Sequence, residues 1–247
     1  MARVAVVVSS WVGNPPEYLL GLCASLDRKP PGAAFDLFLS ANGLDYRVPE
    51  ALAGRFSQVL VRENAGYNLG AWDHAWRRLP GYERYLFLQD DCTVLRSNGL
   101  RDFARRFDEI PRCGLVGEHF RWDEPWDNLV AEQAPEPGLL WEGAPVSRAR
   151  FYKAMLRRWG IPEGATARHL TAVVHFASRQ ALEAVDGYRL GSSYHEAIAA
   201  EIGFSRAIEA AGFRLAQVGR RRHSRIGHRE WKSGGIVARL RQWAGAA

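Results

Sequence analysis

Apolar runs alternate with amphipathic stretches through the first ninety residues of the chain. The run 3–9 is apolar and largely β-branched, which is typical of a parallel strand covered on both faces. Further strands are predicted at 35–40, 58–62 and 85–88, and helices at 15–26, 49–56 and 69–78. Asn14 precedes two prolines and is predicted to cap the first helix. This alternation predicts an α/β fold with right-handed βαβ units and a mostly parallel sheet.

The pattern changes in the second half of the chain. Residues 119–145 are rich in Trp, Glu, Pro and Asp without a clear period, and we interpret them as a functional surface loop. The other elements predicted here are helices at 98–108, 179–185 and 194–211 and strands at 114–116, 169–178 and 213–218. We interpret residues 1–247 as a single domain, with halves at 1–118 and 119–219 and a basic tail at 220–247.

Polar residues collect where the predicted strands end. Ligands of open α/β sheets bind at the carboxyl ends of the strands. Ser9-Ser10, Asn42-Gly43, Glu63-Asn64 and Gln89-Asp90-Asp91 follow the four strands. Adjacent carboxylates repel each other, so a cation is expected at Asp90 and Asp91, and Mg²⁺ or Mn²⁺ bridging a diphosphate fits their oxygen ligands. The alternative is a solvated turn or a helix cap.

A second polar segment, 63–73, lies between a strand and a helix. Asn64, Gly66, Asn68 and Gly70 alternate there, and glycines let a backbone approach a ligand while a helix start offers N–H groups to phosphate or carboxylate. The segment is neither the glycine-rich dinucleotide motif nor a phosphate loop of the P-loop type.

These segments carry a resemblance to a known family. The stretches VAVVVSS, DLFLSANG, NAGYNLGAWDHAW and LFLQDD, within 4–94, resemble the nucleotide-binding half of the family 2 glycosyltransferases in order and spacing. Residues 172–188 and 200–213 are similar to the acceptor side of that family. The resemblance implies a Rossmann-like GT-A fold with helices on both faces of the sheet. Residues 1–118 would bind the nucleotide sugar, and 119–219 would bind the acceptor and hold the catalytic residues.

The resemblance also implies a reaction. A sugar would pass, with inversion, from a nucleotide-diphosphate donor to a hydroxyl of a glycan or lipid-linked glycan, with Mn²⁺ or Mg²⁺ holding the leaving diphosphate. Gap-free counting from Gly212 places Glu201 on the second acid of the family's Glu-Asp pair, so Glu201 is the expected base. Glu196 is the second choice, although Ser193-x-x-Glu196 is also a capping box.

The full set of expected site residues follows from these motifs. Substrate contacts are expected from Ser9, Asn42, Asn64, Gly66, Asn68, Gly70, Asp73, Gln89, Asp90 and Trp122, and metal ligands from Asp91, Asp90 and His223, with His228 behind it. Trp122 offers an indole face for a pyranose ring.

Two positions depart from the family pattern. Ala41 stands where the family has an aspartate that contacts uracil, and Gln89 stands for the first acid of the metal motif. Donors based on thymidine, guanosine or cytidine therefore stay open beside uridine. A degenerate, binding-only glycosyltransferase and a sugar-phosphate nucleotidyltransferase are alternatives, although the latter needs a glycine-rich loop that does not follow the first strand.

Charge and composition bear on partners and location. The net charge is +6, and arginines crowd the segment after Arg220. No nucleic-acid module is recognisable, and the acidic strand end would repel a phosphate backbone, so no nucleic-acid partner is expected. Residues 236–243 have an apolar helical stripe that predicts either a docked helix or an interfacial helix on an anionic membrane. Three scattered cysteines and a first apolar run too short for a signal peptide or membrane span favour a cytoplasmic protein, with peripheral contact at the inner membrane face as the second interpretation.

Overall fold

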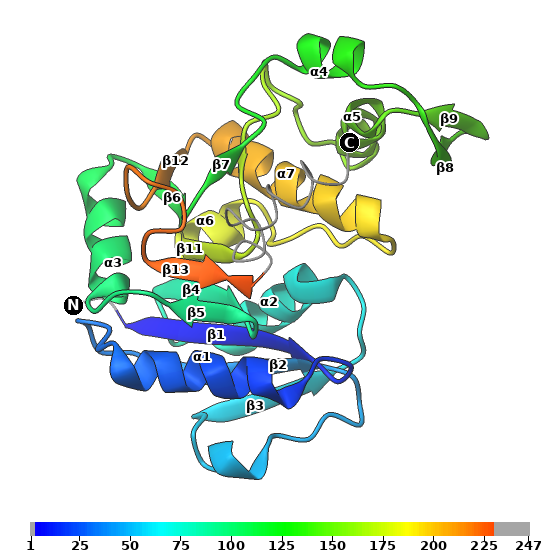
Figure 1. Ribbon diagram of the computed structural model, residues 1–247. Coiled ribbons are helices and arrows are strands. Elements are labelled where there is room, and N and C mark those ends of the chain that lie inside the picture. The colour runs from blue at the N-terminus through cyan, green and yellow to red at the C-terminus, as the bar shows by residue number, and fades with distance from the viewer. Residues whose placement is uncertain (1–2, 230–247) are drawn as a thin grey trace, which may run out of the picture.

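The computed structural model describes residues 3–229, and its centre is a seven-stranded sheet (Figure 1). The strand order is β12-β6-β11-β4-β1-β2-β3. The strands are β1 (Val4–Trp11), β2 (Asp36–Asn42), β3 (Gln58–Arg62), β4 (Arg84–Gln89), β6 (Cys113–Gly117), β11 (Val174–Ser178) and β12 (Arg214–Gln217). β11 is antiparallel to β4 and β6, and the other pairs are parallel. The predicted mixed, mostly parallel sheet is confirmed.

Helices cover both faces of this sheet. The helices are α1 (Pro16–Arg28) and α3 (Gly99–Glu109) on one face, and α2 (Tyr67–Arg78), α6 (Arg179–Ala184) and α7 (Tyr194–Ala210) on the other. Alternate residues of β1 enter different cores, because successive side chains of a strand point to opposite faces. Val6 packs in the core that contains Leu22 of α1, and Val7 in the core that contains Trp72 of α2. The continuous apolar run of β1 therefore reflects burial on both faces.

A third core lies beside the sheet, in the lobe drawn at the upper right of Figure 1. Its elements are α4 (Trp126–Glu132), β8 (Glu136–Trp141), β9 (Ala144–Val146) and α5 (Arg148–Arg158), which pack against α7. The expectation that 119–145 is an irregular loop is therefore wrong. Trp126, Leu129 and Leu139 are buried in this core, and that burial orders a segment whose sequence has no regular period.

Helix α5 was missed, although its sequence carries a signal. Ser147 Oγ accepts a hydrogen bond from the backbone N–H of Arg150, which is an N-cap. Phe151, Tyr152, Met155 and Leu156 follow with the spacing of one helical face, and all are buried. The cap and the stripe together predict the helix.

Several short elements complete the described chain. They are η1 (Glu50–Leu52), β5 (Cys92–Val94), β7 (Phe120–Arg121), β10 (His169–Leu170) and β13 (Ile226–His228). The single strand predicted at 169–178 is two strands, because β10 leaves the main sheet and pairs with β7. The three cysteines are free and buried.

Asn14 does not cap α1. The N-cap is Pro15, which has no side-chain hydrogen bond to the helix, while Asn14 Nδ2 lies 3.0 Å from both carboxylate oxygens of Asp90. The hydrogen bonds from Nδ2 to Asp90 hold the Asn14 side chain at the end of β4. Only the tertiary structure brings these two residues together.

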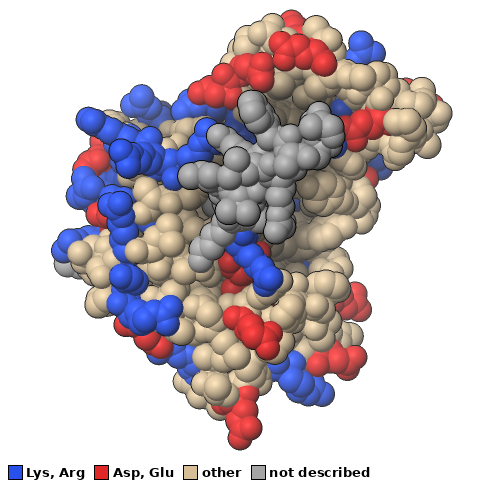
Figure 2. Space-filling view, in the orientation of Figure 1, with Lys and Arg blue, Asp and Glu red and all other residues tan. Residues whose placement is uncertain are grey.

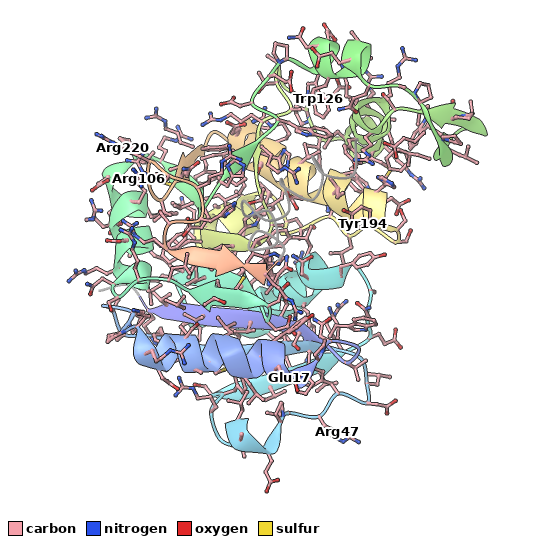
Figure 3. All side chains as sticks on the ribbon, in the orientation of Figure 1. Glu17, Arg47, Arg106, Trp126, Tyr194 and Arg220 are labelled. Atoms are coloured by element: carbon pink, nitrogen blue, oxygen red, sulfur yellow. The ribbon has the colours of Figure 1, made fainter. Side chains whose placement is uncertain are left out.

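Within the predicted tail, the described residues 220–229 include a strand, β13 (Ile226–His228), that belongs to the fold. β13 pairs antiparallel with β5, with His228 opposite Cys92. Arg220 lies near Arg106 in Figure 3, on the side where Lys and Arg gather in Figure 2. The apolar stripe at 236–243 lies outside the described residues. Within residues 3–229, every helix is too short or too polar to cross a membrane.

Candidate functional site

Two adjoining cavities lie at the carboxyl ends of β1, β2 and β4. The smaller cavity, of about 320 Å³, is lined by Ser9, Ser10, Trp11, Asn14, Asn42, Asn64, Tyr67, Asn68, Gln89 and Asp90. The larger cavity has a volume of about 570 Å³. The residues that line it include Asp91, His119, Arg121, Trp122, Arg148, Tyr152, His169, Tyr194, Ile198, Glu201, Arg222, His223 and His228. Tyr67, Asn68 and Gln89 line both. The sheet edge therefore forms one continuous site with two compartments.

Asn68 and Gln89 stand at the boundary between the cavities. The side-chain amides of both donate to the carbonyl of Ala172, at 2.8 and 2.7 Å. Each amide thereby uses one N–H, which leaves the other N–H and the amide oxygen available to a ligand. Gln89, which replaces the first acid of the family motif, thus joins β4 to the segment between β10 and β11.

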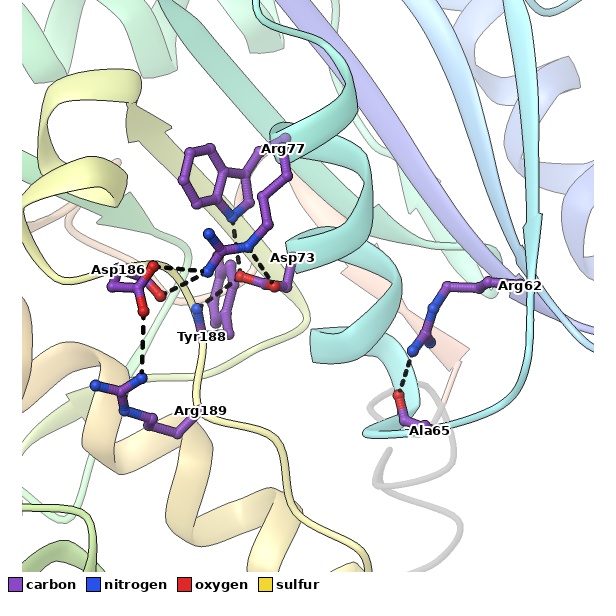
Figure 4. Close-up of polar contacts among 8 residues, drawn as sticks. Arg62, Ala65, Asp73, Arg77, Asp186, Tyr188 and Arg189 are labelled. Carbon is purple, nitrogen blue, oxygen red and sulfur yellow. Dashed lines mark hydrogen bonds and ion pairs between the residues drawn. The ribbon is translucent and has the colours of Figure 1, made fainter.

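Asn42 and Ser9 also line the smaller cavity. Asn42 Nδ2 donates to the carbonyl of Tyr67 at 2.9 Å, and its oxygen accepts from Arg62, which also reaches the carbonyl of Ala65 (Figure 4). Ser9 Oγ donates to the carbonyl of Leu88 at 3.2 Å. Ala41 is fully buried and is not among the residues that line the cavity.

Asp90 belongs to the smaller cavity. Its carboxylate is almost completely buried and accepts hydrogen bonds from Ser10 Oγ at 2.5 Å and from Asn14. Tyr46 donates in turn to Ser10 Oγ at 2.9 Å. Burial raises the pKa of Asp90, while the hydrogen bonds from Ser10 and Asn14 oppose that rise. Asp90 thus lines the smaller cavity and is hydrogen-bonded there, while metal binding by both Asp90 and Asp91 stays a prediction.

Asp91 faces the larger cavity and contacts a histidine. His228 Nε2, on β13, lies 2.9 Å from Asp91 Oδ1. The sequence placed His223 first, yet the contact belongs to His228. His223 lines the same cavity and lies edge-to-face with His119, with ring centroids 5.4 Å apart. Burial, together with the nearby His119 and Arg222, lowers the pKa of His223 to about 4.

Asp91 and His228 have the spacing of two ligands of one divalent cation, but they are only two ligands. Two ligands at about 2.1 Å from one octahedral metal lie about 3 Å apart, which is close to the spacing of Asp91 and His228. Across residues 3–229, no group of three or more His, Cys, Asp or Glu side chains is arranged to hold a metal. The two side chains can therefore supply two ligands of a divalent cation, and its other ligands would have to come from substrate or water.

Glu118 holds the segment that carries these histidines, and sequence reasoning missed it. Its buried carboxylate accepts three backbone N–H groups, from Ser224 at 2.8 Å, Arg225 at 2.9 Å and Ile226 at 2.7 Å. Burial raises the pKa of Glu118 and these N–H groups pull it back down. A charged residue two positions after the apolar run 114–116 is the only signal that the sequence offers.

Replacing Glu118 with Gln is expected to loosen the segment 224–228. The amide keeps the shape but loses the charge-assisted bonds, so the free energy of unfolding should fall by roughly 2–3 kcal/mol. Hydrogen exchange of the Ser224, Arg225 and Ile226 amides, measured by NMR, should quicken more than exchange in β1. Unchanged protection of these three amides would contradict the anchoring role.

One face of α7 lines the larger cavity. Tyr194, Ala197, Ile198 and Glu201 have the i, i+3, i+4, i+7 spacing of that face. Glu201 has a side chain that is 20% exposed, and its Oε1 lies 3.3 Å from His169 Nε2. The predicted base is thus in the cavity that contains Asp91.

Glu196 has a different environment. It accepts from the backbone N–H of Ser192 at 2.7 Å and from Ser192 Oγ at 2.6 Å, and Ser193 Oγ accepts from its N–H. These hydrogen bonds from Ser192 lower the pKa of Glu196. Glu196 is not among the residues that line either cavity, so the capping box explains it.

Aromatic side chains form a wall of the larger cavity. Trp122 and Tyr152 lie 5.4 Å apart with ring planes 30° from parallel, and Tyr194 is largely exposed (Figure 3). Trp126 is instead buried, and its indole N–H donates to the carbonyl of Glu163 at 3.1 Å. Of Trp122 and Trp126, Trp122 is therefore the one that lines the cavity.

Three predicted contact residues lie outside both cavities. Asp73 accepts from Trp76 and Arg77 of its own helix and from the backbone N–H of Tyr188, and so ties α2 to the turn before Tyr188 (Figure 4). A Cβ at Gly70 would lie 2.0 Å from the carbonyl oxygen of Ala65. Gly66 has φ +76° and packs against Leu190. The glycines shape the turn itself.

The fold is similar to that of solved glycosyltransferases. No protein-family model matches the sequence, and no curated protein matches it significantly. A mannosyltransferase from Pyrobaculum calidifontis, solved with GDP-Man and Mn²⁺, superposes with a TM-score of 0.56 at 14% identity, over 87% of this chain and 54% of that one. The chain has a GT-A fold. It spans about half the length of that mannosyltransferase chain.

Other GT-A structures are more distant. The catalytic domain of Drosophila β1,4-galactosyltransferase 7, solved with xylobiose, has a TM-score of 0.47 at 12% identity and covers 93% of this chain and 71% of that one. The bifunctional glycosyltransferase WbbM has a TM-score of 0.44 at 14% identity, over 87% of this chain and 38% of that one.

Proposed function

We propose that the protein is an inverting glycosyltransferase that moves a sugar from a nucleotide-diphosphate sugar to a hydroxyl of a glycan or lipid-linked glycan. The observation that carries this proposal is the placement of Asp91, His228 and Glu201 in one cavity that adjoins a second, nucleoside-sized cavity. The GT-A fold supports it, because the solved mannosyltransferase of that fold holds GDP-Man and Mn²⁺.

The two cavities divide the substrates between them. The smaller cavity receives the nucleoside, where buried Asp90 and the amide oxygens of Asn68 and Gln89 accept from hydroxyl and N–H groups. The diphosphate lies at the boundary between the cavities. Its negative charge is next to Arg222 and the Asp91–His228 pair, which line the larger cavity. The acceptor sugar packs against Trp122.

The transfer step follows from this arrangement. Glu201 takes the proton of the acceptor hydroxyl, and the oxygen forms a bond to the anomeric carbon as the bond from that carbon to the diphosphate oxygen breaks. A divalent cation held by Asp91 and His228 would supply charge neutralisation to the leaving diphosphate. Attack from the side opposite the leaving group gives inversion.

Thermal-shift measurements with UDP, GDP, dTDP and CDP, each with and without Mn²⁺, test this proposal. A ligand at about 100 times its Kd stabilises the folded state by about 2.7 kcal/mol, which raises Tm by several degrees for a chain of this size. We expect one diphosphate to give that rise, and only with Mn²⁺. No rise with any of the four would refute a nucleotide-sugar enzyme.

The nucleotidyltransferase alternative receives no support from the described residues. Such an enzyme needs a glycine-rich loop directly after its first strand, and here the turn after β1 carries Val12, Gly13 and Asn14. The binding-only alternative is decided by turnover, because a degenerate protein would bind a diphosphate and release none from any nucleotide sugar.

A further inference from the structure

His169 lies against the carboxylate proposed as the base, and no motif in the sequence assigns it a role. It belongs to β10, and its side chain is only 4% exposed. Its Nδ1 lies 2.8 Å from the carbonyl oxygen of Ala167, and its Nε2 lies 3.3 Å from Glu201 Oε1. One imidazole thus connects a backbone carbonyl to the acid.

The two partners determine where the ring carries its protons. A carbonyl oxygen only accepts, so Nδ1 must carry a hydrogen and donate to Ala167. A neutral ring with that tautomer would turn the Nε2 lone pair toward Glu201, and two lone pairs repel. The contact therefore requires a proton between Nε2 and Oε1. With this proton on Nε2, the contact is an attractive pair between an imidazolium and a carboxylate.

The surrounding structure fixes this geometry. β10 pairs with β7, with His169 opposite Arg121, and the ring lies edge-to-face with Trp122 at a centroid distance of 6.2 Å. The backbone N–H of Leu170 donates to Ser205 Oγ at 3.1 Å. Ser205 is one helical turn beyond Glu201 on α7, so the strand and the helix are joined beside the contact.

We propose that His169 is a positioning residue, whose imidazolium donates from Nε2 to Glu201 Oε1 and holds the carboxylate ionised and oriented. The inference rests on the proposed role of Glu201 as the base. Because Oε1 is used by His169, Oε2 takes the acceptor proton as the new glycosidic bond forms and the bond to the diphosphate breaks. The Nε2 proton stays on His169 throughout.

A spectroscopic measurement tests the proton without any substrate. In protein labelled with ¹⁵N-histidine at neutral pH, the His169 ring, identified by its loss in the His169→Asn variant, should show both nitrogens protonated. In Glu201→Gln, Nε2 should move to the chemical-shift range of an unprotonated imidazole nitrogen, because the amide can donate to it. An unprotonated Nε2 in the wild-type protein would overturn the inference.

A pair of substitutions tests the positioning. His169→Gln keeps a donor near the place of Nε2, whereas His169→Asn keeps only a donor near the place of Nδ1. Release of diphosphate from UDP-glucose, GDP-mannose and dTDP-glucose, with Mn²⁺ and with water as the acceptor, provides the assay. We expect kcat to fall about 10- to 100-fold in the Asn variant, with KM within about twofold, and to recover within about fivefold of wild type in the Gln variant.

The outcomes separate this inference from the proposed function. Equal losses in the Asn and Gln variants, or a change in KM alone, would overturn the positioning role while leaving the enzyme assignment intact. A wild-type protein that releases no diphosphate from these nucleotide sugars, and is stabilised by none of the four diphosphates, would count against the proposed function. The ¹⁵N measurement would still show whether His169 Nε2 carries the proton that faces Glu201.

Discussion

Replacing Asp91 with Ala is expected to abolish the Mn²⁺-dependent part of nucleoside diphosphate binding. Asp91 is the carboxylate that faces the larger cavity, and His228 contacts its Oδ1 at 2.9 Å. Loss of the carboxylate leaves one imidazole for the cation, and we expect the affinity for the diphosphate measured with Mn²⁺ to fall by roughly 100-fold or more. Isothermal titration calorimetry with and without Mn²⁺ measures this change.

Three further variants make the result specific. His228→Ala should produce a similar loss, whereas His223→Ala should produce a smaller one, because the contact with Asp91 belongs to His228. Asp127→Asn removes the same charge from a side chain that is 97% exposed on α4, and should bind as the wild type does. Unchanged affinity in Asp91→Ala would remove the cation site from the proposed mechanism.

Replacing Glu201 with Gln should leave donor binding intact and nearly eliminate transfer. The amide has the size of the carboxylate but takes no proton from an acceptor, and a positioned general base contributes about 10²- to 10⁴-fold to the rate. We expect kcat to fall within that range while the thermal shift with diphosphate and Mn²⁺ stays at the wild-type value. Diphosphate release from the preferred nucleotide sugar measures the rate.

Glu196→Gln is the matched control on the same helix. Its carboxylate is engaged by Ser192 at the start of α7, so the variant should lose roughly 1 kcal/mol of stability and keep its turnover. The opposite pattern, with turnover lost in Glu196→Gln and kept in Glu201→Gln, would transfer the role of the base to Glu196.

The choice of donor nucleotide depends on the smaller cavity. Ala41 is buried, so the position that contacts uracil in the resembling family contributes no polar group here. The polar side chains that line this cavity include Ser10, Asn14, Asn64 and Asp90, together with Asn42, Asn68 and Gln89. A nucleoside bound here would therefore be recognised by residues at the carboxyl ends of several strands, and the panel of diphosphates tests which base they accept.

Local pattern was sufficient for the elements of the sheet. Strands such as β1 and β4 are buried on both faces, and burial on both faces requires a continuous apolar run that is visible along the chain. The acids at 90–91 could be placed at a ligand site because parallel strands bring their carboxyl ends to one edge. The resemblance supplied Glu201, and the structure puts it in the cavity with Asp91.

Tertiary contacts decided the rest. Asp90 and Asp91 are adjacent in sequence, yet Ser10 and Asn14 hold one while His228 contacts the other, over separations of 76 to 137 residues. The same reason explains Glu118 and His169, whose partners lie on segments far along the chain. Gly70 shows the converse, because its small size serves packing within its own turn against the carbonyl of Ala65.

The sequence by itself determined the α/β layers, the edge of the sheet at which polar side chains gather, and the two acids that end β4. These properties follow from periodicity and from the direction of neighbouring strands, which are local. Only the tertiary structure decided which acid faces which cavity, which histidine reaches Asp91, and which ring supports Glu201. Each of those contacts depends on where a segment distant in sequence packs in the folded protein. The free energy that holds the segment there comes from the burial of side chains in the cores.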